Sequence, residues 1–284
     1  MSTKAALVIR ATGSQGVGVT RHLLRLGWKV HAFVTNPEDP RALALESIGA
    51  TPFKGTLGDA SSIEAAIRGC NALFLNQMPS FADDAETREA SSILSIAKAA
   101  GVEHVVHSTT LPLNDPEIRS KIGDSITAPA VFGKGDVEQL VQNSTIPWTI
   151  IRPGYFMTNL IAPVVAIMFP EMRIGKFLNS YDSSTILPLV DPDDIGAFAA
   201  AAFQDPQKFR GQIVSVAGEK LSIKDIIKEI SRAAGKDIEI VYRTKEETEA
   251  EIMNPLIAGQ TMSNDLDRLV DIEEVGRWGV PLTS

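Results

Sequence analysis

The sequence is poor in cysteine and has no cluster of basic residues. Cys70 is the only cysteine among the 284 residues, which excludes intrachain disulfides and multi-thiolate zinc sites and favours a reducing compartment. The 27 Lys and Arg residues face 35 Asp and Glu residues, so the formal charge is -8. Without a basic run, nucleic acid and anionic membranes are poor partners, because little on the chain can neutralise phosphates. We therefore expect a small molecule as the main partner.

Long apolar runs and export signals are lacking as well. The longest apolar stretch, residues 160–170, is interrupted by Pro163 and is too short to cross a bilayer. We expect it to form core in a substrate-binding lobe. Residues 1–9 lead directly into a predicted strand, without the charged, apolar and small-residue regions of a signal peptide. These features favour a cytoplasmic protein.

Metal ligands are also sparse. His104 and His107 lie three positions apart on a predicted strand, which puts them on opposite faces. No acidic cluster or histidine pair elsewhere has ligand spacing, so we predict no metal site. The pair Asp193 and Asp194 is expected to cap the helix that starts near Ile195 rather than to act as acid and base.

What is present is a regular alternation of short apolar runs with longer segments of helical period, several of them closed by glycine. Such alternation is typical of βαβ units and predicts an α/β fold with a doubly wound parallel sheet, the Rossmann architecture, in residues 1–152. The predicted strands are residues 5–9, 30–34, 51–53, 72–75, 105–107 and 148–151, and the predicted helices are residues 17–26, 41–48, 62–67, 84–100 and 133–142.

The regular alternation of strands and helices ends after Arg152, where prolines divide the chain into short segments. Residues 153–284 are expected to form mostly a smaller substrate-binding lobe, with some elements returning to the Rossmann sheet. Regular elements resume as a helix over 194–203, a strand over 212–216 and a helix over 222–234, for which Ser222 is a good N-cap.

Residues 5–18, AALVIRATGSQGVG, read as a strand, a glycine-bearing turn and the start of a helix. In this context backbone N–H groups and the positive helix end can hold a pyrophosphate, and glycine removes the Cβ that would block it. Gly13 and Gly16 match the second and third glycines of the dinucleotide pattern, whereas Arg10 occupies the first position. The alternative is a tight turn that binds no ligand.

The end of the second predicted strand bears on cofactor choice. An NAD site would place an acid there to bind the ribose 2′-hydroxyl, but no acid occurs before Glu38. Thr35 and Asn36, with Arg10 or Arg41, can instead supply donors to a 2′-phosphate. NADP(H) is therefore favoured over NAD. The alternative is that residues 35–37 simply form a turn and bind no phosphate.

Several motifs together resemble the NmrA-like and isoflavone-reductase-like atypical short-chain dehydrogenases. The glycine turn is joined by GTLGD at 55–59, VVHST at 105–109, Lys134 with Glu138, RPGYFMTN at 152–159 and PLVDPDDIG at 188–196. The resemblance covers nearly the whole chain. It implies a Rossmann domain that binds NADP(H), a reductase activity and an apolar small-molecule substrate.

The resemblance also implies roles for individual residues. Arg10 stands where the family has glycine and Thr35 where many members have a phosphate-binding arginine; Arg10 either supplies that charge or crowds the cofactor. By resemblance, the pyrophosphate is held by Thr12, Gly13, Ser14, Gln15 and Gly16, the adenine lies by Leu57, the nicotinamide ribose is flanked by Gln77, Met78 and Pro79, and the nicotinamide is covered by Pro153, Gly154, Tyr155 and Phe156.

Lys134 matches the family lysine that contacts the ribose and can take part in proton transfer. A lysine that loses hydration beside the cofactor has a lowered pKa and can relay a proton; the alternative is a solvated lysine on a helix surface. Ala130 occupies the place of the tyrosine that usually precedes such a lysine. Tyr155 and Ser108 are the remaining catalytic candidates, although a packing tyrosine and a turn-capping serine are equally ordinary.

Three functions agree with these observations. The first is an NADP(H)-dependent oxidoreductase acting on an apolar carbonyl or activated double bond, in a pocket made hydrophobic by Phe156, Met157, Ile161, Met168 and Phe169. The second is a redox sensor that binds NADP(H) without turnover. The third is a non-redox isomerase or cyclase on the same scaffold. The sequence leaves substrate identity and oligomeric state open.

Overall fold

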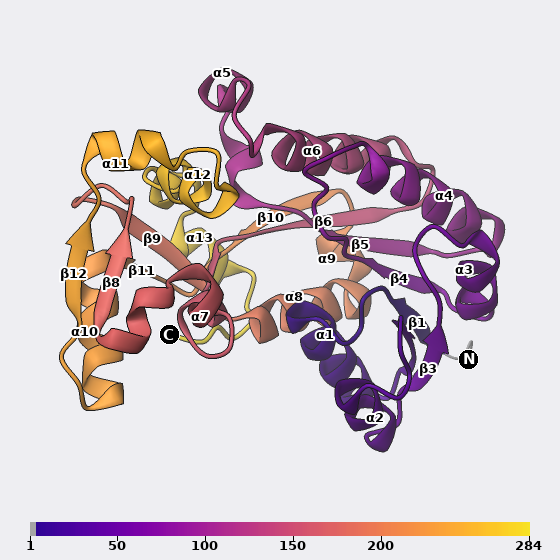
Figure 1. Ribbon diagram of the computed structural model, residues 1–284. Helices are drawn as coiled ribbons and strands as arrows, with labels where there is room; N and C mark the ends of the chain where they lie inside the picture. The colour runs from indigo at the N-terminus through magenta and orange to yellow at the C-terminus, as the bar shows by residue number, and fades with distance from the viewer. Residues whose placement is uncertain (1–3) are drawn as a thin grey trace.

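A computed structural model describes residues 4–284 as two lobes joined along one edge of a parallel sheet (Figure 1). The larger lobe is built on a seven-stranded sheet in the order β10-β6-β5-β4-β1-β2-β3, in which every pairing is parallel. This confirms the doubly wound α/β fold. Its strands are β1 (Ala5–Val8), β2 (Lys29–Val34), β3 (Thr51–Lys54), β4 (Ala72–Leu75), β5 (His104–Ser108), β6 (Trp148–Pro153) and β10 (Gln212–Val216).

Helices cover both faces of this sheet, which explains why its strands are apolar throughout rather than alternating. One face packs against α1 (Ser14–Arg25), α2 (Pro40–Ser47) and α8 (Pro192–Gln204), and the other against α3 (Ala60–Ile67), α4 (Ala85–Ala99) and α6 (Ala128–Asn143). Helix α6 begins earlier than its periodicity predicts. Pro129 lies in its first turn, where a missing N–H leaves no intrahelical bond unmade.

Apart from the predicted helix over 222–234, the smaller lobe is formed by chain segments that the sequence pattern did not resolve into elements. Strands β7 (Tyr155–Phe156), β9 (Ile186–Val190) and β11 (Glu219–Ser222) form one sheet, and β8 (Lys176–Asn179) pairs with β12 (Glu239–Tyr242). A separate apolar cluster, which includes Phe169 and Phe177, fills this lobe. Its helical segments are α7 (Val165–Met168), α10 (Ile223–Ala234), α11 (Lys245–Ala250), α12 (Pro255–Met262), η2 (Met157–Leu160) and η3 (Pro170–Ile174).

The remaining helical segments are short. They are α5 (Ile118–Ile122), α9 (Pro206–Phe209), α13 (Ile272–Arg277), η1 (Leu111–Asn114) and η4 (Leu266–Leu269). Ser222 caps α10 as predicted, because its side chain accepts a hydrogen bond from the backbone N–H of Asp225. Within residues 4–284 no helix is both long and apolar enough to span a membrane.

Helix α8 returns to the large sheet and crosses α1 at very short range. A Cβ on Gly196 would lie 2.4 Å from the carbonyl carbon of Gly18, so both helices need glycine at the crossing. The expected capping by Asp193 and Asp194 is wrong: Asp191 caps α8 by accepting from the Asp193 N–H. Asp194 instead accepts from the backbone N–H and the hydroxyl of Thr283, and thus holds the end of the chain against α8.

Candidate functional site

The turn between β1 and α1 has the backbone that a dinucleotide-binding turn requires. Arg10 adopts a φ of +53°, the only positive φ of a non-glycine residue among residues 4–284. This conformation favours glycine, which explains why related turns carry glycine at that position. Gly13 precedes α1, and neither a side-chain cap nor an acidic residue occupies the first turn of that helix. The N–H groups and positive end of α1 are therefore available to an anion.

The other residues of the turn have distinct positions. A Cβ on Gly16 would lie 2.3 Å from the Arg10 carbonyl oxygen and 2.7 Å from the Ala11 Cα, so Gly16 allows α1 to pack against the turn. A Cβ on Gly13 would lie 3.2 Å from the same oxygen, a much milder contact. Ser14 and Gln15 form the first turn of α1, with the Gln15 side chain buried.

A cavity of about 350 Å³, named here the turn cavity, lies beside this turn. It brings together seven residues that are cofactor-binding candidates from the sequence with four others, and no carboxylate is among them. The candidates are Arg10, Thr12, Gly13, Thr35, Arg41, Leu57 and Met78, and the others are Phe33, Val34, Gly55 and Thr56.

The two arginines of the turn cavity differ in their pairing. Arg41 donates from Nε and Nη2 to the carboxylate of Asp39 at 3.0 and 2.7 Å, so its charge is largely compensated. Arg10 forms no ion pair with a carboxylate in the described part of the chain, and partial burial lowers its pKa. Arg10 is thus the uncompensated cation of this cavity. Asn36 is outside the wall and accepts a hydrogen bond from the Glu38 N–H.

Lys134 is buried behind the loop that follows β4. Only 8% of the residue is exposed, and its Nζ donates to the Gln77 carbonyl oxygen at 2.8 Å and to Glu86 Oε1 at 2.5 Å. Burial lowers the pKa of Lys134, and the Glu86 carboxylate opposes that shift. Glu138, one turn further along α6, pairs with Arg152 instead. Lys134 lies outside the walls of both cavities described here.

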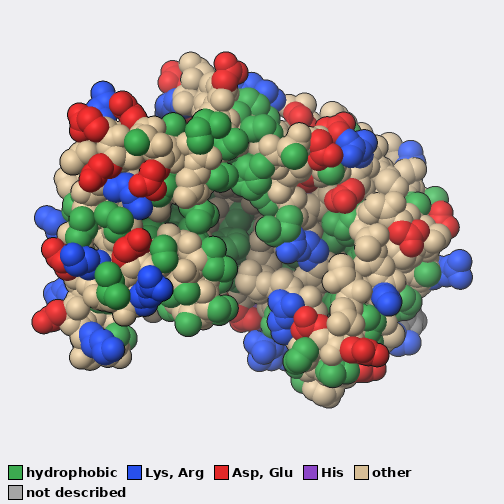
Figure 2. All heavy atoms as spheres, viewed as in Figure 1, with side chains coloured by type: hydrophobic (Ala, Val, Ile, Leu, Met, Phe, Trp, Pro, Cys, Tyr) green, Lys and Arg blue, Asp and Glu red, His purple; other side chains and the backbone are tan. Residues whose placement is uncertain are grey.

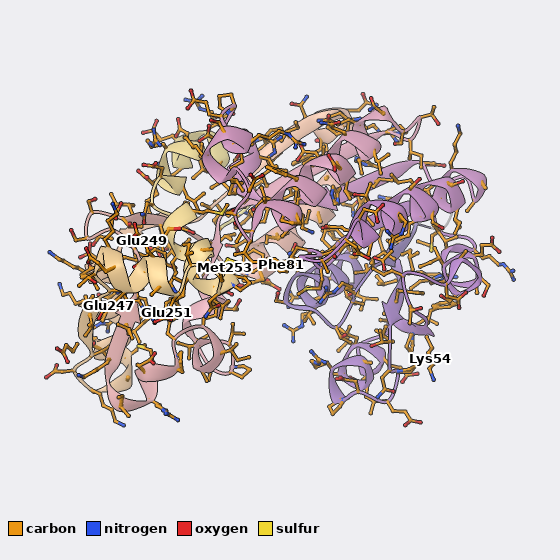
Figure 3. All side chains as sticks on the ribbon, turned by 45° about the horizontal axis from the view of Figure 1, so that its top comes forward. Lys54, Phe81, Glu247, Glu249, Glu251 and Met253 are labelled. Carbon is orange, nitrogen blue, oxygen red and sulfur yellow. The ribbon has the colours of Figure 1, made fainter. Side chains whose placement is uncertain are left out.

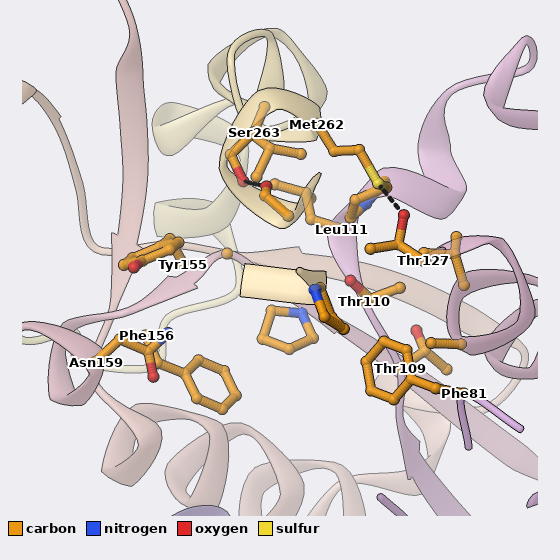
Figure 4. A pocket seen from close by; sticks show the side chains of 18 residues that line it. Phe81, Thr109, Thr110, Leu111, Thr127, Tyr155, Phe156, Asn159, Met262 and Ser263 are labelled. Carbon is orange, nitrogen blue, oxygen red and sulfur yellow. Dashed lines mark hydrogen bonds between the residues drawn. The ribbon is translucent and has the colours of Figure 1, made fainter. Parts of the chain in front are cut away.

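A second cavity of about 350 Å³, the sheet-edge cavity, lies at the carboxyl ends of β5 and β6 between the two lobes (Figure 4). Figure 2 shows the hollow there, with hydrophobic side chains along its walls. Among the predicted residues it contains Pro153, Gly154, Tyr155 and Phe156, and its polar groups are those of Thr109, Thr110, Thr127, Asn159 and Ser263. None of its lining side chains is charged at neutral pH.

The apolar wall differs from the sequence-based expectation. Of the five residues expected there, only Phe156 lines the cavity; Met157, Met168 and Phe169 pack within the smaller lobe, and Ile161 is exposed. The wall is formed instead by the loop after β4, by η1, by the start of α6, by α12 and by η4, with Phe81, Leu111, Pro112, Ala130, Val131, Pro255, Gly259, Met262 and Leu266. The sequence offered no signal for α12 as part of a site.

The remaining candidates have defined places. Ser108 is enclosed, and its Oγ has no hydrogen-bond partner within residues 4–284, whereas the next two residues, Thr109 and Thr110, face the sheet-edge cavity. Burial raises the pKa of Tyr155, so its hydroxyl keeps its proton at neutral pH. Pro79 lies in the wall of neither cavity.

Charged residues of the smaller lobe lie away from this site. Figure 3 shows Glu247 and Glu249 of α11, with Glu251 just after it, on the outside of that lobe, whereas Phe81 lies at the junction of the lobes. His104 and His107 are buried in β5, where His107 Nδ1 lies 3.0 Å from the Leu75 carbonyl oxygen. No group of three or more metal-ligating side chains occurs in the described chain.

Comparison with known proteins agrees with this geometry. The sequence model of the NmrA-like family matches residues 2–275. An NAD(P)H azoreductase from Xenophilus azovorans is 30% identical over 244 residues, covering 85% of this chain and 78% of the relative. A (4-alkanoyl-5-oxo-2,5-dihydrofuran-3-yl)methyl phosphate reductase from Streptomyces griseus is 28% identical over 234 residues, covering 82% and 74%. The NADP complex of NmrA, a negative transcriptional regulator, has the same fold, with a TM-score of 0.73 at 22% identity and coverage of 98% and 95%.

Proposed function

The chain belongs to the NmrA-like family, and from that premise we propose that it is an NADP(H)-dependent reductase of uncharged, apolar small molecules. The acceptor is a carbonyl compound or an activated double bond. The observation that carries the proposal is the turn cavity, which combines two arginines and three threonines with no carboxylate, beside a helix N-terminus that lacks a cap. That set of donors suits the 2′-phosphate and pyrophosphate of NADP(H) better than the free ribose hydroxyls of NAD.

The residues of the chain divide the work of binding the cofactor. The first turn of α1, with Thr12 and Gly13, would hold the pyrophosphate, and Arg10 with Thr35 would bind the 2′-phosphate. Met78 and residues 153–156 would border the nicotinamide end, because each lines one of the two cavities. Gln77 would lie behind them, where its carbonyl oxygen accepts from Lys134. The bound cofactor supplies the hydride.

The sheet-edge cavity would select the substrate. Its wall is apolar and carries hydroxyl and amide groups but no charge, so an anionic substrate would lose its hydration without gaining a partner. The Streptomyces relative is named for a phosphate ester, and this cavity has no cation to receive one. We therefore favour a neutral quinone, azo compound or enone as the substrate class.

The protein would polarise the acceptor through side chains that reach this cavity. Thr109 and Thr110 line this cavity and can donate to the oxygen that gains negative charge. Tyr155 keeps its hydroxyl proton, but that hydroxyl is enclosed, so Tyr155 would shape the wall rather than donate to the acceptor. Ser108 would act from behind them, because its hydroxyl is enclosed. Lys134 would place a positive charge behind the nicotinamide side without entering the substrate cavity.

A comparison of NADPH and NADH tests the cofactor assignment. NADPH should bind at least roughly tenfold more tightly at low salt, with a gap that narrows as salt screens the phosphate contacts. Calorimetric titration of both cofactors at low and high ionic strength measures this. Arg10→Ala should remove most of the preference, while Arg25→Ala, at the far end of α1, serves as the matched control. Equal affinities for the two cofactors would contradict the assignment.

A regulator that binds NADP(H) without turnover is the second candidate. Two observations favour it: Ala130 replaces the usual tyrosine, and Lys134 is committed to Gln77 and Glu86. The fold neighbour NmrA is itself described as a transcriptional regulator. Tight NADPH binding without oxidation by any member of a panel of quinones and azo dyes would support this candidate. Failure to bind NADPH would favour a non-redox isomerase or cyclase.

A further inference from the structure

Glu86 is a buried carboxylate beside the proposed cofactor site that the sequence motifs do not identify. It lies in the first turn of α4, and only 2% of the residue is exposed. A carboxylate buried to this extent is retained in a folded protein only with a compensating partner. The positive N-terminal end of α4 supplies part of this compensation, because helix N-termini favour negative charge.

The other part comes from Lys134. Its Nζ lies 2.5 Å from Glu86 Oε1 and donates at the same time to the Gln77 carbonyl oxygen at 2.8 Å. The Gln77 side chain closes the network, since its Nε2 donates to the Glu86 carbonyl oxygen at 2.9 Å and to Glu89 Oε2 at 3.1 Å. Three segments, namely the loop after β4, α4 and α6, therefore meet at one ammonium group.

The contacts give Glu86 a role distinct from that of the neighbouring carboxylate. Glu86 touches the ammonium directly, whereas Glu89 reaches only the Gln77 amide. Glu86 Oε2 has no hydrogen-bond partner within residues 4–284 and is 3.5 Å from the position of a Cβ on Gly133. Oε1 is thus the one oxygen through which this carboxylate acts on Lys134.

We propose that Glu86 is a positioning residue that holds the Lys134 ammonium charged and fixed against the Gln77 carbonyl, on the nicotinamide side of the cleft. This inference rests on the proposed NADP(H) function. Held in this way, Lys134 anchors the loop that would flank the nicotinamide ribose and presents a positive charge behind it. The proton of Lys134 is then available only while Glu86 remains ionised.

Of the charged and titratable groups around Lys134, Glu86 is the one that keeps its ammonium protonated. Arg10, from the turn after β1, acts against the charge of Lys134 through Coulomb repulsion, and burial acts in the same direction. His107 of β5 is neutral, because burial lowers its pKa to about 3. Glu89 of α4 is the other nearby carboxylate and makes no contact with the ammonium. If Glu86 loses its charge, repulsion and burial are left unopposed and the pKa of Lys134 must fall.

A titration of Lys134 tests this directly and does not depend on activity. Carbon-13-labelled lysine in the full chain, with the Lys134 resonance assigned from Lys134→Arg, reports the midpoint by NMR. In Glu86→Gln, which keeps the size of the side chain, the midpoint should fall by at least about one pH unit. Glu89→Gln, the matched control on the same helix, should move it far less.

Two further measurements keep the test decisive. If Glu86→Gln does not fold, Glu86→Asp, which withdraws the carboxylate by one methylene, should lower the midpoint by a smaller amount. In turnover assays with saturating NADPH, the decline of kcat at high pH should begin at lower pH in Glu86→Gln, an effect that a purely structural role would not produce. An unchanged Lys134 midpoint in Glu86→Gln would overturn the inference even if NADPH turnover were intact. Absence of NADPH binding by the wild type would instead overturn the proposed function.

Discussion

At the scale of single residues, Arg10 has a backbone conformation that is unfavourable for stability and a charge that is favourable for binding phosphate. Its φ of +53° belongs to the left-handed region, which costs a residue with a Cβ about 1–2 kcal/mol relative to glycine. Its guanidinium is the uncompensated cation of the turn cavity, since Arg41 is paired with Asp39. Residues kept in strained conformations are frequently functional, because the surrounding structure must offset their cost.

Arg10→Gly should therefore change stability and cofactor affinity in opposite directions. Relief of the left-handed conformation, reduced by the greater freedom of glycine in the unfolded chain, should raise the free energy of unfolding by about 0.5–1 kcal/mol. Loss of the guanidinium should weaken NADPH binding and leave NADH binding nearly unchanged. Urea unfolding and calorimetry measure the two effects.

Arg10→Ala is the matched control for this substitution. It removes the same charge but keeps a Cβ at the left-handed position, so it should lose NADPH affinity without gaining stability. A glycine variant no more stable than the alanine variant would show that the turn is not strained at Arg10.

At the scale of elements, β5 carries two histidines that the fold keeps neutral. Burial lowers the pKa of His104 to about 4 and that of His107 to about 3. His104 Nε2 lies 2.9 Å from Thr149 Oγ1, and its ring packs against Phe203 of α8. The two rings thus point to opposite faces of the sheet, as their spacing predicts, and each is enclosed by a different layer of helices.

This burial makes the stability of the fold sensitive to mild acid. Both histidines have folded pKa values below the unfolded value of about 6.5, so below that pH the unfolded chain binds protons that the folded chain does not. The free energy of unfolding should fall by about 2 kcal/mol per histidine between about pH 6.5 and pH 5. Urea unfolding at several pH values measures this slope.

The substitution His104→Gln separates the contribution of His104 to this pH dependence of stability from that of His107. Glutamine can retain the hydrogen bond to Thr149 but does not titrate, so the loss of stability in this pH range should be about half that of wild type. Carboxylates with lowered pKa values, such as Asp39 at about 2, act only at more acidic pH. The same pH dependence in His104→Gln and wild type would contradict this account of β5.

At the scale of the whole molecule, the sheet-edge cavity exists only because the two lobes meet. Its wall combines Thr109 and Thr110 at the sheet edge with Met262 from a helix far later in the chain. The hydroxyl of Thr127, the residue before α6, donates to the Met262 sulfur at 2.7 Å across this junction. If this cavity binds the substrate, as proposed, its selectivity is a property of the assembled lobes rather than of either one.

The absence of charge in this wall predicts discrimination between substrates of similar shape. A neutral naphthoquinone should be reduced with a kcat/KM at least roughly tenfold higher than its sulfonated analogue, because the sulfonate would be desolvated without a partner. Steady-state assays with saturating NADPH measure the ratio. Met262→Lys, which adds a cation to the wall, should narrow the difference. Equal use of both quinones by the wild type would place the substrate outside this cavity.

The sequence by itself determined the features that depend on local pattern. Residues close together in the sequence determine the strand and helix periods, the glycines that end helices and the turn after β1. The parallel sheet and its dinucleotide-type turn could therefore be predicted. The same local pattern placed Arg10 and Thr35 at one cavity, because parallel strands end at one edge of a sheet, and the family resemblance added Thr12 and Leu57.

Only the tertiary structure decided which distant residues meet. Glu86 contacts Lys134, and Met262 reaches the wall of the sheet-edge cavity, through packing between elements, which leaves no periodic trace in the sequence. Ser108 is enclosed at the end of β5, while Thr109, the next residue, lines the sheet-edge cavity. Side-chain environment depends on contacts across long separations in the chain, whereas secondary structure depends mainly on near neighbours, and this is why the fold could be predicted further than the site.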